Sequence, residues 1–439
     1  LKGQRSPGID IAIIGAGAAG LIAGKVMMDA GFDVTLYEQQ RRPGGVWVYD
    51  AEPETDPLGR TDPSDFRHAA LYASLHTNLP RDLMAFECFT FDTAGGGDDA
   101  WPRYPHHTQV QIYLARFADH FDLTPRIRYG TLVEALVPGS DGRWTVHTSE
   151  ARATFDAVIV CNGHYARPRI PPLPGADEFA GLRMHSKSYR APELFRGMRV
   201  ALWGAAASGV DISREISGVA AATYWCGDRF EDRAPPREAE PGKVHTCRSP
   251  DGFSDERTLA FGEERVEIDA FVYCTGYHYT FDFLEPGVLE VNDNHVGPLY
   301  RDIVSATHPN LAFIGIPYLV IPFPLCEVQA HYLAEMWRGA ARLPERDAML
   351  AWCREREQNN IRSGVKLRHY HRLAEAQFDY MRTLTGEAGL PEPPGWREAL
   401  ADEANKLRTA RPEVFRSVDL PHLGPTVIAR TSGQDVPDP

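Results

Sequence analysis

The stretch from Ile9 to Glu38, IDIAIIGAGAAGLIAGKVMMDAGFDVTLYE, decides the fold of this chain. It opens on a mostly apolar, β-branched run, which predicts a buried parallel strand over residues 9–14. Glycines follow without a linker, and residues 18–30 then favour a helix that stops at Gly31. Residues 34–37 predict a second strand. Strand, helix and strand together make one βαβ unit.

The glycines of this unit, GAGAAG over residues 15–20, have the spacing of a dinucleotide-binding turn. Gly15 permits the tight turn, Gly17 lets the backbone approach a pyrophosphate, and Gly20 lets helix and strand pack closely. Glu38 lies 18 residues beyond Gly20, where an acid reaches a ribose hydroxyl. Because both strands and the acid accompany the glycines, we expect a dinucleotide site here rather than ordinary glycine turns.

A second unit of the same kind begins about 190 residues later. Residues 199–203 predict a strand, the run Gly204-Ala-Ala206-Ala-Ser208-Gly209 predicts the turn, and residues 210–216 predict the helix. Ala206 replaces the middle glycine of the pattern. An internal duplication at this spacing indicates a flavin domain interrupted by a nicotinamide domain. The sequence therefore predicts an α/β fold with two Rossmann-type dinucleotide-binding domains, the smaller NADP domain inserted in the larger FAD domain.

Two strand-to-glycine turns bracket the predicted insert. One is the strand 157–161 before Gly163, and the other is the strand 270–274 before Thr275 and Gly276. We predict the first part of the FAD-binding domain over residues 1–168, the NADP-binding insert over 169–270, and the second part of the FAD-binding domain, with a helical C-terminal region, over 271–439. Further expectations are a surface loop over 228–255 and a helix over 329–342.

Length and composition are those of an enzyme-sized globular protein. The 439 residues are 43% hydrophobic and 24% charged, which excludes collagen-like, coiled-coil and wholly disordered chains. The 46 Lys and Arg against 60 Asp and Glu give a net charge of −14. Because such a charge repels polyanions, we expect no nucleic-acid partner.

The cysteines and histidines indicate no metal site. Seven cysteines are scattered without Cys-x-x-Cys spacing, as expected for free thiols in a reducing compartment. The pairs His106-His107 and His369-Tyr-His371 lack further ligands and are expected at the surface. Residues 1–8 are polar, so we expect no signal peptide, and prolines interrupt the longest apolar stretch, 311–325, so we expect no membrane span. The predicted location is cytoplasmic.

Four further segments accompany the GAGAAG turn in a fixed order. They are Gly44-Gly45-Val-Trp47, the block Tyr72–Pro80 that ends in TNLP, the match of Phe179–Tyr189 to the pattern FxGxxxHxxx(Y/F), and the turn Cys274-Thr275-Gly276-Tyr277. With these five segments the chain resembles the flavin-containing monooxygenases that oxygenate soft nitrogen and sulfur nucleophiles. The segments Cys161–Tyr165 and Val296–Tyr300 are similar to those of plant-type, sulfur-oxygenating members.

The resemblance implies an activity and its cofactors. It implies an oxidoreductase with FAD and NADPH in which a nicotinamide hydride reduces the flavin, O2 adds as a flavin hydroperoxide, and a small-molecule amine or sulfide takes one oxygen. The cofactor carries the oxygen chemistry, and the protein supplies position and excludes water. Sulfides, amines and amino-acid derivatives all stay open as substrates, and so does a homodimer.

The resemblance also implies roles for particular residues. Asn78 is the residue we expect to act in catalysis, because its amide can donate to a peroxide oxygen without supplying an acid. The alternative is that Asn78 only forms a turn. The cofactor-binding residues that the resemblance implies are Gly15, Gly17, Gly20, Glu38, Gly45, Trp47, His185, Tyr189, Gly204, Ser208, Gly209, Arg229, Thr275, Gly276 and Gln329.

Some of these residues have structural alternatives. Trp47 is either a neighbour of the flavin or a core residue. His185 and Tyr189 serve cofactor and linker geometry, or are simply satisfied structural residues. Ser208 binds a nicotinamide phosphate or caps a helix.

Preference for NADPH over NADH depends on the end of the second unit's second strand. Asp228 lies about where the resemblance implies an arginine for the 2′-phosphate. Arg229, one position on, can serve instead, and Arg190 is a further alternative. NADH therefore stays open.

Three rival functions compete with this interpretation. A Baeyer–Villiger monooxygenase shares the two-unit plan, but its pattern has Trp where this chain has Tyr189. A pyridine-nucleotide disulfide reductase needs a dithiol pair that the sequence lacks. A flavoprotein that holds nucleotide without oxygenase turnover stays open, because Ala206 departs from the glycine pattern.

Overall fold

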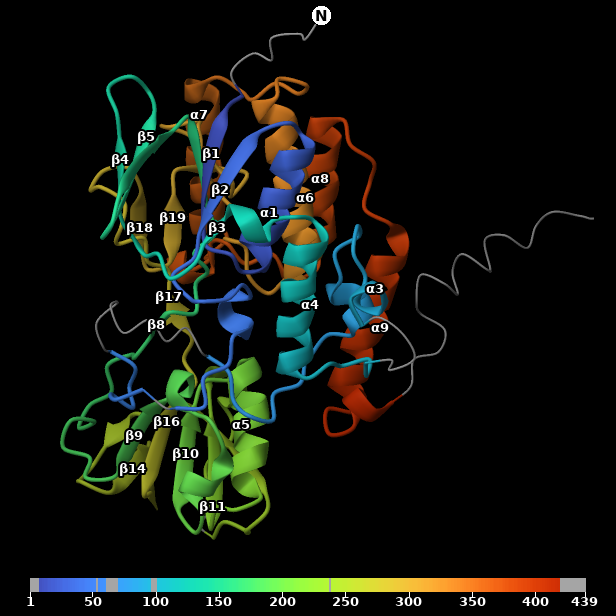
Figure 1. The fold of residues 1–439 in the computed structure, drawn as a ribbon. Coiled ribbons are helices and arrows are strands. Elements are labelled where there is room, and N and C mark those ends of the chain that lie inside the picture. Colours follow the sequence, from blue (N-terminus) through green and yellow to red (C-terminus); the bar gives the residue numbers. More distant parts are fainter. Residues whose placement is uncertain (1–7, 53, 61–69, 96–100, 237, 419–439) are drawn as a thin grey trace, which may run out of the picture. The chain divides into compact units, whose positions relative to one another are not determined.

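The computed structural model describes residues 8–52, 54–60, 70–95, 101–236 and 238–418. The first seven residues, where we expect no signal peptide, lie outside these ranges. The described chain forms two compact units, and each is built from separate segments (Figure 1). The first unit takes its described residues from 1–48, 76–163 and 281–439, and the second takes them from 49–75 and 164–280.

A mixed sheet is the centre of the first unit. Its strands lie in the order β20 (Leu299–Tyr300), β21 (Val304–Ser305), β22 (Leu311–Phe313), β7 (Ala157–Val160), β1 (Asp10–Ile14), β2 (Asp33–Tyr37) and β3 (Ile127–Arg128). The five strands from β22 to β3 are parallel, β21 pairs antiparallel with β22, and β20 pairs antiparallel with β21. The carboxyl ends of the parallel strands therefore share one edge, where open α/β sheets bind ligands.

Helices cover this sheet and form the C-terminal region. They are α1 (Ala18–Asp29), α2 (Arg81–Met84), α3 (Phe91–Gly95), α4 (His107–His120), α6 (Pro322–Trp337), α7 (Arg346–Arg362), α8 (Gln377–Ala388) and α9 (Gly395–Ala410). In Figure 1, α1, α6 and α8 lie side by side. Leu21, Ile22 and Leu333 are fully buried, so the helix–sheet interface supplies a large part of the core.

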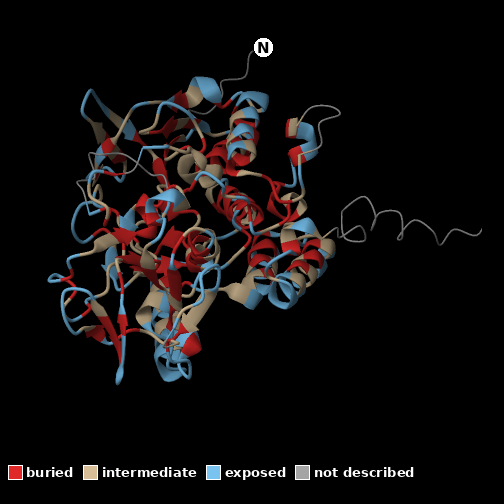
Figure 2. Cartoon of the chain, turned by 90° about the horizontal axis from the view of Figure 1, so that it is seen from below, coloured by how far each residue is buried: buried red, intermediate tan, exposed pale blue. Residues whose placement is uncertain are grey.

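Smaller elements complete the first unit. An antiparallel sheet consists of β4 (Val133–Pro138), β5 (Trp144–Thr148) and β6 (Arg152–Phe155), and a hairpin consists of β18 (Glu290–Asn292) and β19 (His295–Gly297). Short 3-10 helices are η1 (Gly45–Trp47), η2 (Thr124–Arg126), η6 (Leu367–His369), η7 (Ala374–Ala376) and η8 (Phe415–Ser417). Figure 2 shows the burial pattern, with buried residues on strands and inner helix faces and exposed residues on outer loops.

The second unit repeats the parallel plan on a smaller scale. Its main sheet has the order β12 (Val244–Cys247), β11 (Ala222–Cys226), β10 (Arg199–Trp203), β16 (Ala270–Tyr273) and β9 (Leu182–His185), and every neighbouring pair is parallel. The helix that follows β10 is α5 (Ala207–Ser217). This β10–α5–β11 arrangement is the second βαβ unit of the sequence analysis, so two Rossmann-type units are confirmed.

The remaining elements of the second unit are short. They are the antiparallel sheet β13 (Gly252–Phe253), β14 (Thr258–Phe261) and β15 (Glu264–Glu267), the pair β8 (Arg167–Pro168) and β17 (Tyr277–His278), and the 3-10 helices η3 (Ser186–Ser188), η4 (Pro192–Phe195) and η5 (Asp228–Phe230).

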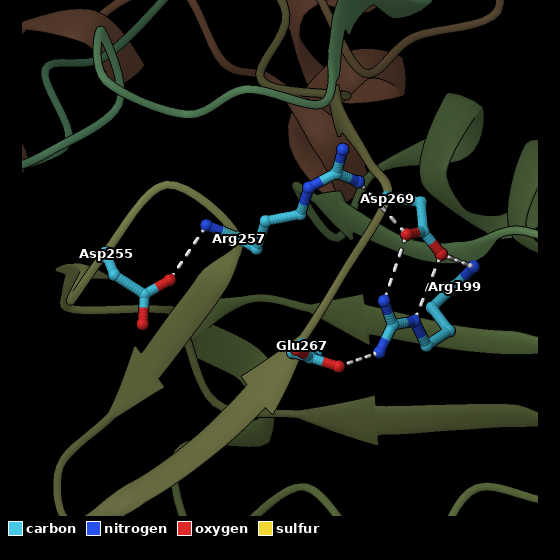
Figure 3. A network of polar contacts seen from close by, with 5 residues as sticks. All are labelled: Arg199, Asp255, Arg257, Glu267 and Asp269. Atoms are coloured by element: carbon cyan, nitrogen blue, oxygen red, sulfur yellow. Dashed lines mark hydrogen bonds and ion pairs between the residues drawn. The ribbon is translucent and has the colours of Figure 1, made fainter.

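Charged residues anchor the amino-terminal edge of this second sheet (Figure 3). The Arg199 guanidinium donates two hydrogen bonds of 3.0 Å to the Asp269 carboxylate and also pairs with Glu267. Arg257 donates to Asp269 at 3.3 Å. These charges lie where β10 and β16 begin, at the edge opposite the glycine turn, so they hold the sheet and leave its carboxyl edge free.

The compact units differ from the predicted domain ranges at three points. The second unit spans 164–280 where the insert was predicted over 169–270, because β17 pairs with β8 beyond the predicted ends. It also includes residues 49–75. The Arg190 guanidinium donates to the carbonyl oxygens of Asp50 and Leu71, which explains this grouping.

One element prediction was wrong, and one had the wrong bounds. The predicted loop 228–255 contains β12, which forms the edge of the sheet. The predicted helix 329–342 begins earlier, as α6 starts at Pro322 and ends at Trp337. Proline is favoured in the first turn of a helix, where its missing N–H costs nothing. Within the described ranges, every helix is too short or too polar to cross a bilayer.

Candidate functional site

The first glycine turn joins β1 to α1 at the carboxyl edge of the larger sheet. Gly15 has a φ of +103°, and a Cβ atom there would lie 2.5 Å from the Cys161 carbonyl oxygen. A Cβ atom on Gly20 would lie 1.9 Å from the Gly15 carbonyl oxygen. Both clashes are with backbone that cannot move aside, so glycine is required at both positions. The tight turn and the close helix–strand packing predicted from the sequence are both present.

Gly17 and Gly45 form a cradle at the start of α1. Gly17 caps the helix in an extended conformation, with φ −75° and ψ −172°. Gly45, in η1, has a φ of +56°, and a Cβ atom on it would lie 2.9 Å from the Gly17 Cα atom. The Gly44 N–H group donates to the Ala16 carbonyl oxygen at 3.0 Å. Two backbone segments without side chains therefore meet at a helix N-terminus, which fits a pyrophosphate.

Glu38 holds the turn together from the end of β2. Its carboxylate accepts hydrogen bonds from the Ala16 N–H at 2.7 Å and from the Gln40 N–H at 2.8 Å. Burial raises the pKa of Glu38, and the two backbone donors counteract that rise. Because a carboxylate has about four acceptor positions, capacity is left for a ribose hydroxyl. Its contact with a ribose stays a prediction.

Trp47 and Gln329 lie in the same unit. Trp47 is half-buried and packs edge-on against Phe323, with 6.5 Å between ring centroids. The fully buried Gln329 amide accepts from the Gly315 N–H at 3.0 Å and donates to the Tyr380 hydroxyl at 2.8 Å. Gln329 therefore positions the Gly315 turn after β22. Direct contact of either residue with a cofactor stays a prediction.

Asn78 lies in a turn that a neighbouring residue stabilises. The Thr77 hydroxyl donates to the Leu79 carbonyl oxygen at 2.8 Å, while Arg416 donates to the Thr77 carbonyl oxygen at 3.0 Å. Asn78 itself is exposed, and within the described part of the chain its amide has no hydrogen-bond partner. The turn therefore does not depend on the Asn78 side chain.

The second glycine turn repeats the sterics of the first. Gly204 has a φ of +128°, and a Cβ atom on it would lie 2.1 Å from the Cys274 carbonyl oxygen. A Cβ atom on Gly209 would lie 2.2 Å from the Gly204 carbonyl oxygen. Ala206 caps α5 with φ −93° and ψ −171°, close to the conformation of Gly17. Alanine therefore adopts this conformation without strain. The two turns differ here only in the volume that the Ala206 methyl group occupies.

Ser208 is not the cap of α5. The helix begins at Ala207 and its cap is Ala206, so the capping alternative is wrong. Ser208 lies in the first turn, where a hydroxyl can supplement the free backbone N–H groups. Its contact with a nicotinamide phosphate stays a prediction.

The counterpart of Glu38 in the second unit is Gly227, not Asp228. Trp203 pairs with Cys226 as Ile14 pairs with Tyr37, so Gly227 follows β11 as Glu38 follows β2. A Cβ atom on Gly227 would lie 2.8 Å from the Ala205 Cβ atom, which leaves no room for an acid. An acid at this position binds a free ribose hydroxyl and would repel a 2′-phosphate.

Two arginines follow Gly227. The exposed Arg229 guanidinium lies 5.1 Å from the Phe230 ring centroid and donates to the Ala205 carbonyl oxygen at 3.3 Å. Arg233 lies 5.5 Å from the same ring. The Asp228 carboxylate is engaged elsewhere, since it accepts a hydrogen bond from the Ser249 hydroxyl at 2.6 Å. The sequence analysis missed Gly227 and Arg233; aligning the two βαβ units strand by strand would have found Gly227.

Arg190 is not available to a phosphate. It is buried, and its guanidinium donates to the Lys187 carbonyl oxygen at 2.7 Å and to that of Asp50 at 2.8 Å. The alternative that placed it on the 2′-phosphate is therefore wrong.

His185 supports the turn that follows β16. It is fully buried, and its Nε2–H donates to the Gly276 carbonyl oxygen at 3.1 Å, while Nδ1 accepts from the Lys187 N–H at 3.1 Å. Burial lowers the pKa of His185 to about 3, so the ring is neutral. Gly276 has a φ of +82°, and the Thr275 hydroxyl donates to the Arg169 carbonyl oxygen. These contacts fix the loop beside Gly204.

Tyr189 and the block before residue 76 hold α5 in place. The Tyr189 hydroxyl donates to the Glu215 carboxylate at 2.7 Å, and the Tyr72 hydroxyl donates to Asp211 at 3.0 Å. The Ser74 hydroxyl also bonds Glu215. Tyr189 therefore positions the helix that carries Ser208. The contacts of His185 and Tyr189 explain why the pattern FxGxxxHxxx(Y/F) has a histidine and an aromatic residue at these two positions.

The two glycine turns, each with its own strand pair and helix, define a flavoprotein with two dinucleotide sites. The family model described as "Flavin-binding monooxygenase-like" matches residues 8–228 and 253–390. The chain belongs to this family, and it is an oxidoreductase of the monooxygenase class with FAD and NADPH as cofactors.

Relatives and solved structures agree with this family. The "Flavin-containing monooxygenase FMO GS-OX-like 4" of Arabidopsis thaliana is 35% identical over 422 residues, 92% of this chain and 93% of that protein. The solved S-allyl-L-cysteine S-oxygenase of Allium sativum is 34% identical, with a TM-score of 0.90 over 97% of this chain and 98% of that one. Tmm of Pelagibacter sp. strain HTCC7211 has a TM-score of 0.77 at 20% identity, covers 93% of each chain, and shows the shared fold. The Baeyer–Villiger alternative is not better supported.

Proposed function

We propose that this chain oxygenates the sulfur of small thioethers, giving sulfoxides. The observation that carries the proposal is the 34% identity and TM-score of 0.90, over nearly the full length of both chains, to an S-allyl-L-cysteine S-oxygenase. Plant relatives named FMO GS-OX are 32–35% identical. A thioether sulfur offers a polarisable lone pair and needs no acid or base from the protein to react.

The overall reaction balances without another reactant. The thioether, O2, NADPH and one proton give the sulfoxide, NADP+ and water. Sulfur and NADPH each lose two electrons, and O2 gains four. One oxygen atom forms the new sulfur–oxygen bond, and the other leaves as water. Bound flavin supplies this oxygen chemistry, and the protein binds, orients and keeps water out.

Asn78 is the residue that we assign to the oxygen-transfer step. Its exposed amide is not used by its own turn, which Thr77 and Arg416 hold. A held loop with a free N–H donor is a preorganised hydrogen-bonding group, which is effective because it needs no rearrangement during the reaction. The amide also cannot lose a proton to a neighbouring oxygen at neutral pH.

The first unit suits FAD through its glycines and acid. Gly15 and Gly20 shape the turn, the bare backbone of Gly17 and Gly45 suits the pyrophosphate, and Glu38 suits the ribose. We assign Trp47 to the flavin side of η1, and Gln329 to positioning of the Gly315 turn.

The second unit suits NADPH in preference to NADH. Gly204, Ser208 and Gly209 present the start of α5 to a pyrophosphate. Gly227 removes the acid that would repel a 2′-phosphate, and Arg229 presents an exposed guanidinium to it. His185, Tyr189, Thr275 and Gly276 hold this turn. Their hydrogen bonds within this unit support a positioning role. All seven cysteines are free thiols, which supports a cytoplasmic location.

The experiment compares sulfur with nitrogen directly. Purified protein with FAD, NADPH and 18O2 is given S-allyl-L-cysteine, methyl propyl sulfide or trimethylamine, and products are measured by mass spectrometry. The expected result is sulfoxide carrying one 18O atom per NADPH consumed, with a higher kcat/KM than for the amine. A higher kcat/KM for trimethylamine than for every thioether would contradict the sulfur assignment. NADPH oxidation that yields only hydrogen peroxide would contradict oxygenase function.

A further inference from the structure

One loop of the first unit has a backbone conformation that its sequence does not favour. Leu319, between β22 and α6, has a φ of +54°. Left-handed backbone costs free energy in any residue with a Cβ atom, and a branched apolar side chain is rare there. Of the non-glycine residues with positive φ in the described ranges, most are Asp, Asn or Arg, and Leu319 alone is a large apolar residue.

The Leu319 side chain is also more exposed than is usual for a leucine. It is 57% exposed, while Pro317 and Ile321 on either side are buried. A leucine that contributes nothing to the core and strains its own backbone destabilises the fold twice. Glycine would remove both penalties, since it adopts positive φ freely and exposes no apolar surface. Strain of this kind gathers at sites that contact ligands.

The conformation of this loop is imposed from both sides. The Tyr318 N–H donates to the His371 carbonyl oxygen at 3.1 Å, and the Leu373 N–H donates to the Tyr318 carbonyl oxygen at 3.3 Å. The Ile321 N–H donates to the Gln377 side chain at 2.7 Å. The loop is therefore tied to the segment that leads into α8, and Leu319 is held outward at its tip.

The loop that carries Leu319 lies at the carboxyl edge of the larger sheet. β22, β7 and β1 are parallel, so the residues after β22 lie at the same edge as the Gly15 turn. A Cβ atom on Gly315 would lie 3.8 Å from Ala19, in the first turn of α1. Leu79 and Val320 pack on the same small core. Asn78 precedes Leu79 in the chain, and Leu319 precedes Val320. Asn78 and Leu319 therefore lie on loops that pack against the same small core.

We infer that Leu319 is a specificity-determining residue that contacts the apolar part of the substrate beside Asn78. The inference rests on the proposed function for the reaction and adds the recognition of an alkyl or allyl chain. An exposed leucine gains hydrophobic contact only when a ligand covers it. The substrate class is thus a nucleophile with an aliphatic arm of several carbons rather than a fully polar one.

Two variants separate contact from fold. Leu319→Asn keeps the size but removes the apolar surface, and asparagine tolerates left-handed backbone. Leu319→Gly removes the side chain and the strain together. Ile361→Asn, on the outer face of α7, is the matched control because Ile361 is 63% exposed. We expect both Leu319 variants to keep bound flavin and the wild-type melting temperature or a higher one.

The measurement is kcat/KM for methyl ethyl, methyl propyl, methyl butyl and methyl pentyl sulfide. In the wild type and Ile361→Asn, we expect a rise of about two- to fourfold per methylene, as for CH2 groups that leave water. In Leu319→Asn and Leu319→Gly, the rise should fall below about 1.5-fold per methylene. Isothermal titration of methyl pentyl sulfoxide into the oxidised protein should show the same loss of affinity.

The outcomes distinguish this inference from the proposed function. If the wild type oxygenates amines instead of thioethers, the proposed function fails, and the chain-length test proceeds with N,N-dimethylalkylamines. If the rise per methylene is unchanged in both Leu319 variants, the inference is wrong whichever nucleophile reacts. Loss of flavin or of melting temperature in Leu319→Gly would also overturn it, by assigning the residue to the fold.

Discussion

The two glycine turns have the same backbone but differ at the two positions that a nucleotide meets. Gly17 and Ala206 cap their helices in nearly the same conformation, yet one has no side chain and the other has a methyl group. Glu38 follows the second strand of one unit, and Gly227 follows that of the other. Backbone geometry is therefore set by glycines that both turns share, and we propose that ligand choice is set by the residues in which the two turns differ.

The largest expected effect tests the middle position of the turn. A Cβ atom on Gly17 would lie 3.4 Å from Gly45, so Gly17→Val should fold but fill the pyrophosphate cradle with its methyl groups. We expect near-complete loss of bound flavin, measured by absorbance after gel filtration. The matched variant Ala206→Val should keep its flavin and raise KM for NADPH. Full flavin content in Gly17→Val would mean that the cradle is not the FAD site.

The next effect tests the loop that only the first unit has. Asn78→Ala should reduce flavin with NADPH at the wild-type rate but lower sulfoxide formation by roughly 100- to 1000-fold, since a preorganised donor to a reactive oxygen is lost. Hydrogen peroxide release should rise to match NADPH consumption. Stopped-flow absorbance and a peroxide assay measure both. Asn292→Ala, exposed on the β18–β19 hairpin, is the control, and unchanged coupling in Asn78→Ala would return that residue to a turn-forming role.

A smaller effect tests the residues after Gly227. Arg229→Ala should lower the preference for NADPH over NADH by about 10- to 100-fold, because a charge-assisted bond to the 2′-phosphate is lost. Arg233→Ala, which shares the Phe230 ring, should change the ratio less. Steady-state kinetics with both nucleotides give the ratio. If only Arg233→Ala lowers it, the phosphate lies on the other side of Phe230.

The smallest effect tests the buried histidine beside the second turn. His185 has a pKa of about 3 in the folded chain, against an ordinary value near 6.5. The unfolded chain therefore takes up a proton first as pH falls. The stability that His185 contributes is complete above pH 6.5 and is lost as pH falls toward 3, by at most about 1.4 kcal/mol per pH unit.

His185→Gln removes this titration and keeps a donor and an acceptor in place. Between pH 7 and pH 5.5, its free energy of unfolding should fall less than that of the wild type, as measured by urea denaturation. An equal fall in His185→Gln and in the wild type would mean that other groups dominate the acid sensitivity.

Much of the fold could be predicted because short-range sterics specify it. The strand 199–203 and the start of α1 follow from an apolar run that meets a glycine turn, and both are confirmed. β12 was missed because an edge strand needs little apolar pattern, and residues 244–246 are only half-buried. The start of α6 was missed because Pro322 and Pro324 were interpreted only as breaks.

The site was predicted less completely than the fold because its geometry depends on long-range pairing. That Gly227 is the partner of Glu38 follows from strand register, which one strand alone does not reveal. Arg190 looked available in the sequence, but segments far away in the chain bury its guanidinium. Leu319 gives no signal in the sequence, because only its backbone angle and exposure distinguish it from a core leucine.

The bond from Arg416 to Thr77 also affects the order in which the protein matures. Chains fold from the N-terminus as they are synthesised, so the first βαβ unit emerges from the ribosome long before residue 416. The Arg397 guanidinium in α9, which donates to the Leu83 and Ala85 carbonyl oxygens, emerges almost as late. The contacts that hold the Asn78 loop therefore form only after nearly the whole of residues 1–416 has been synthesised. On the proposed role of Asn78, oxygen transfer is among the last capabilities that the growing polypeptide acquires.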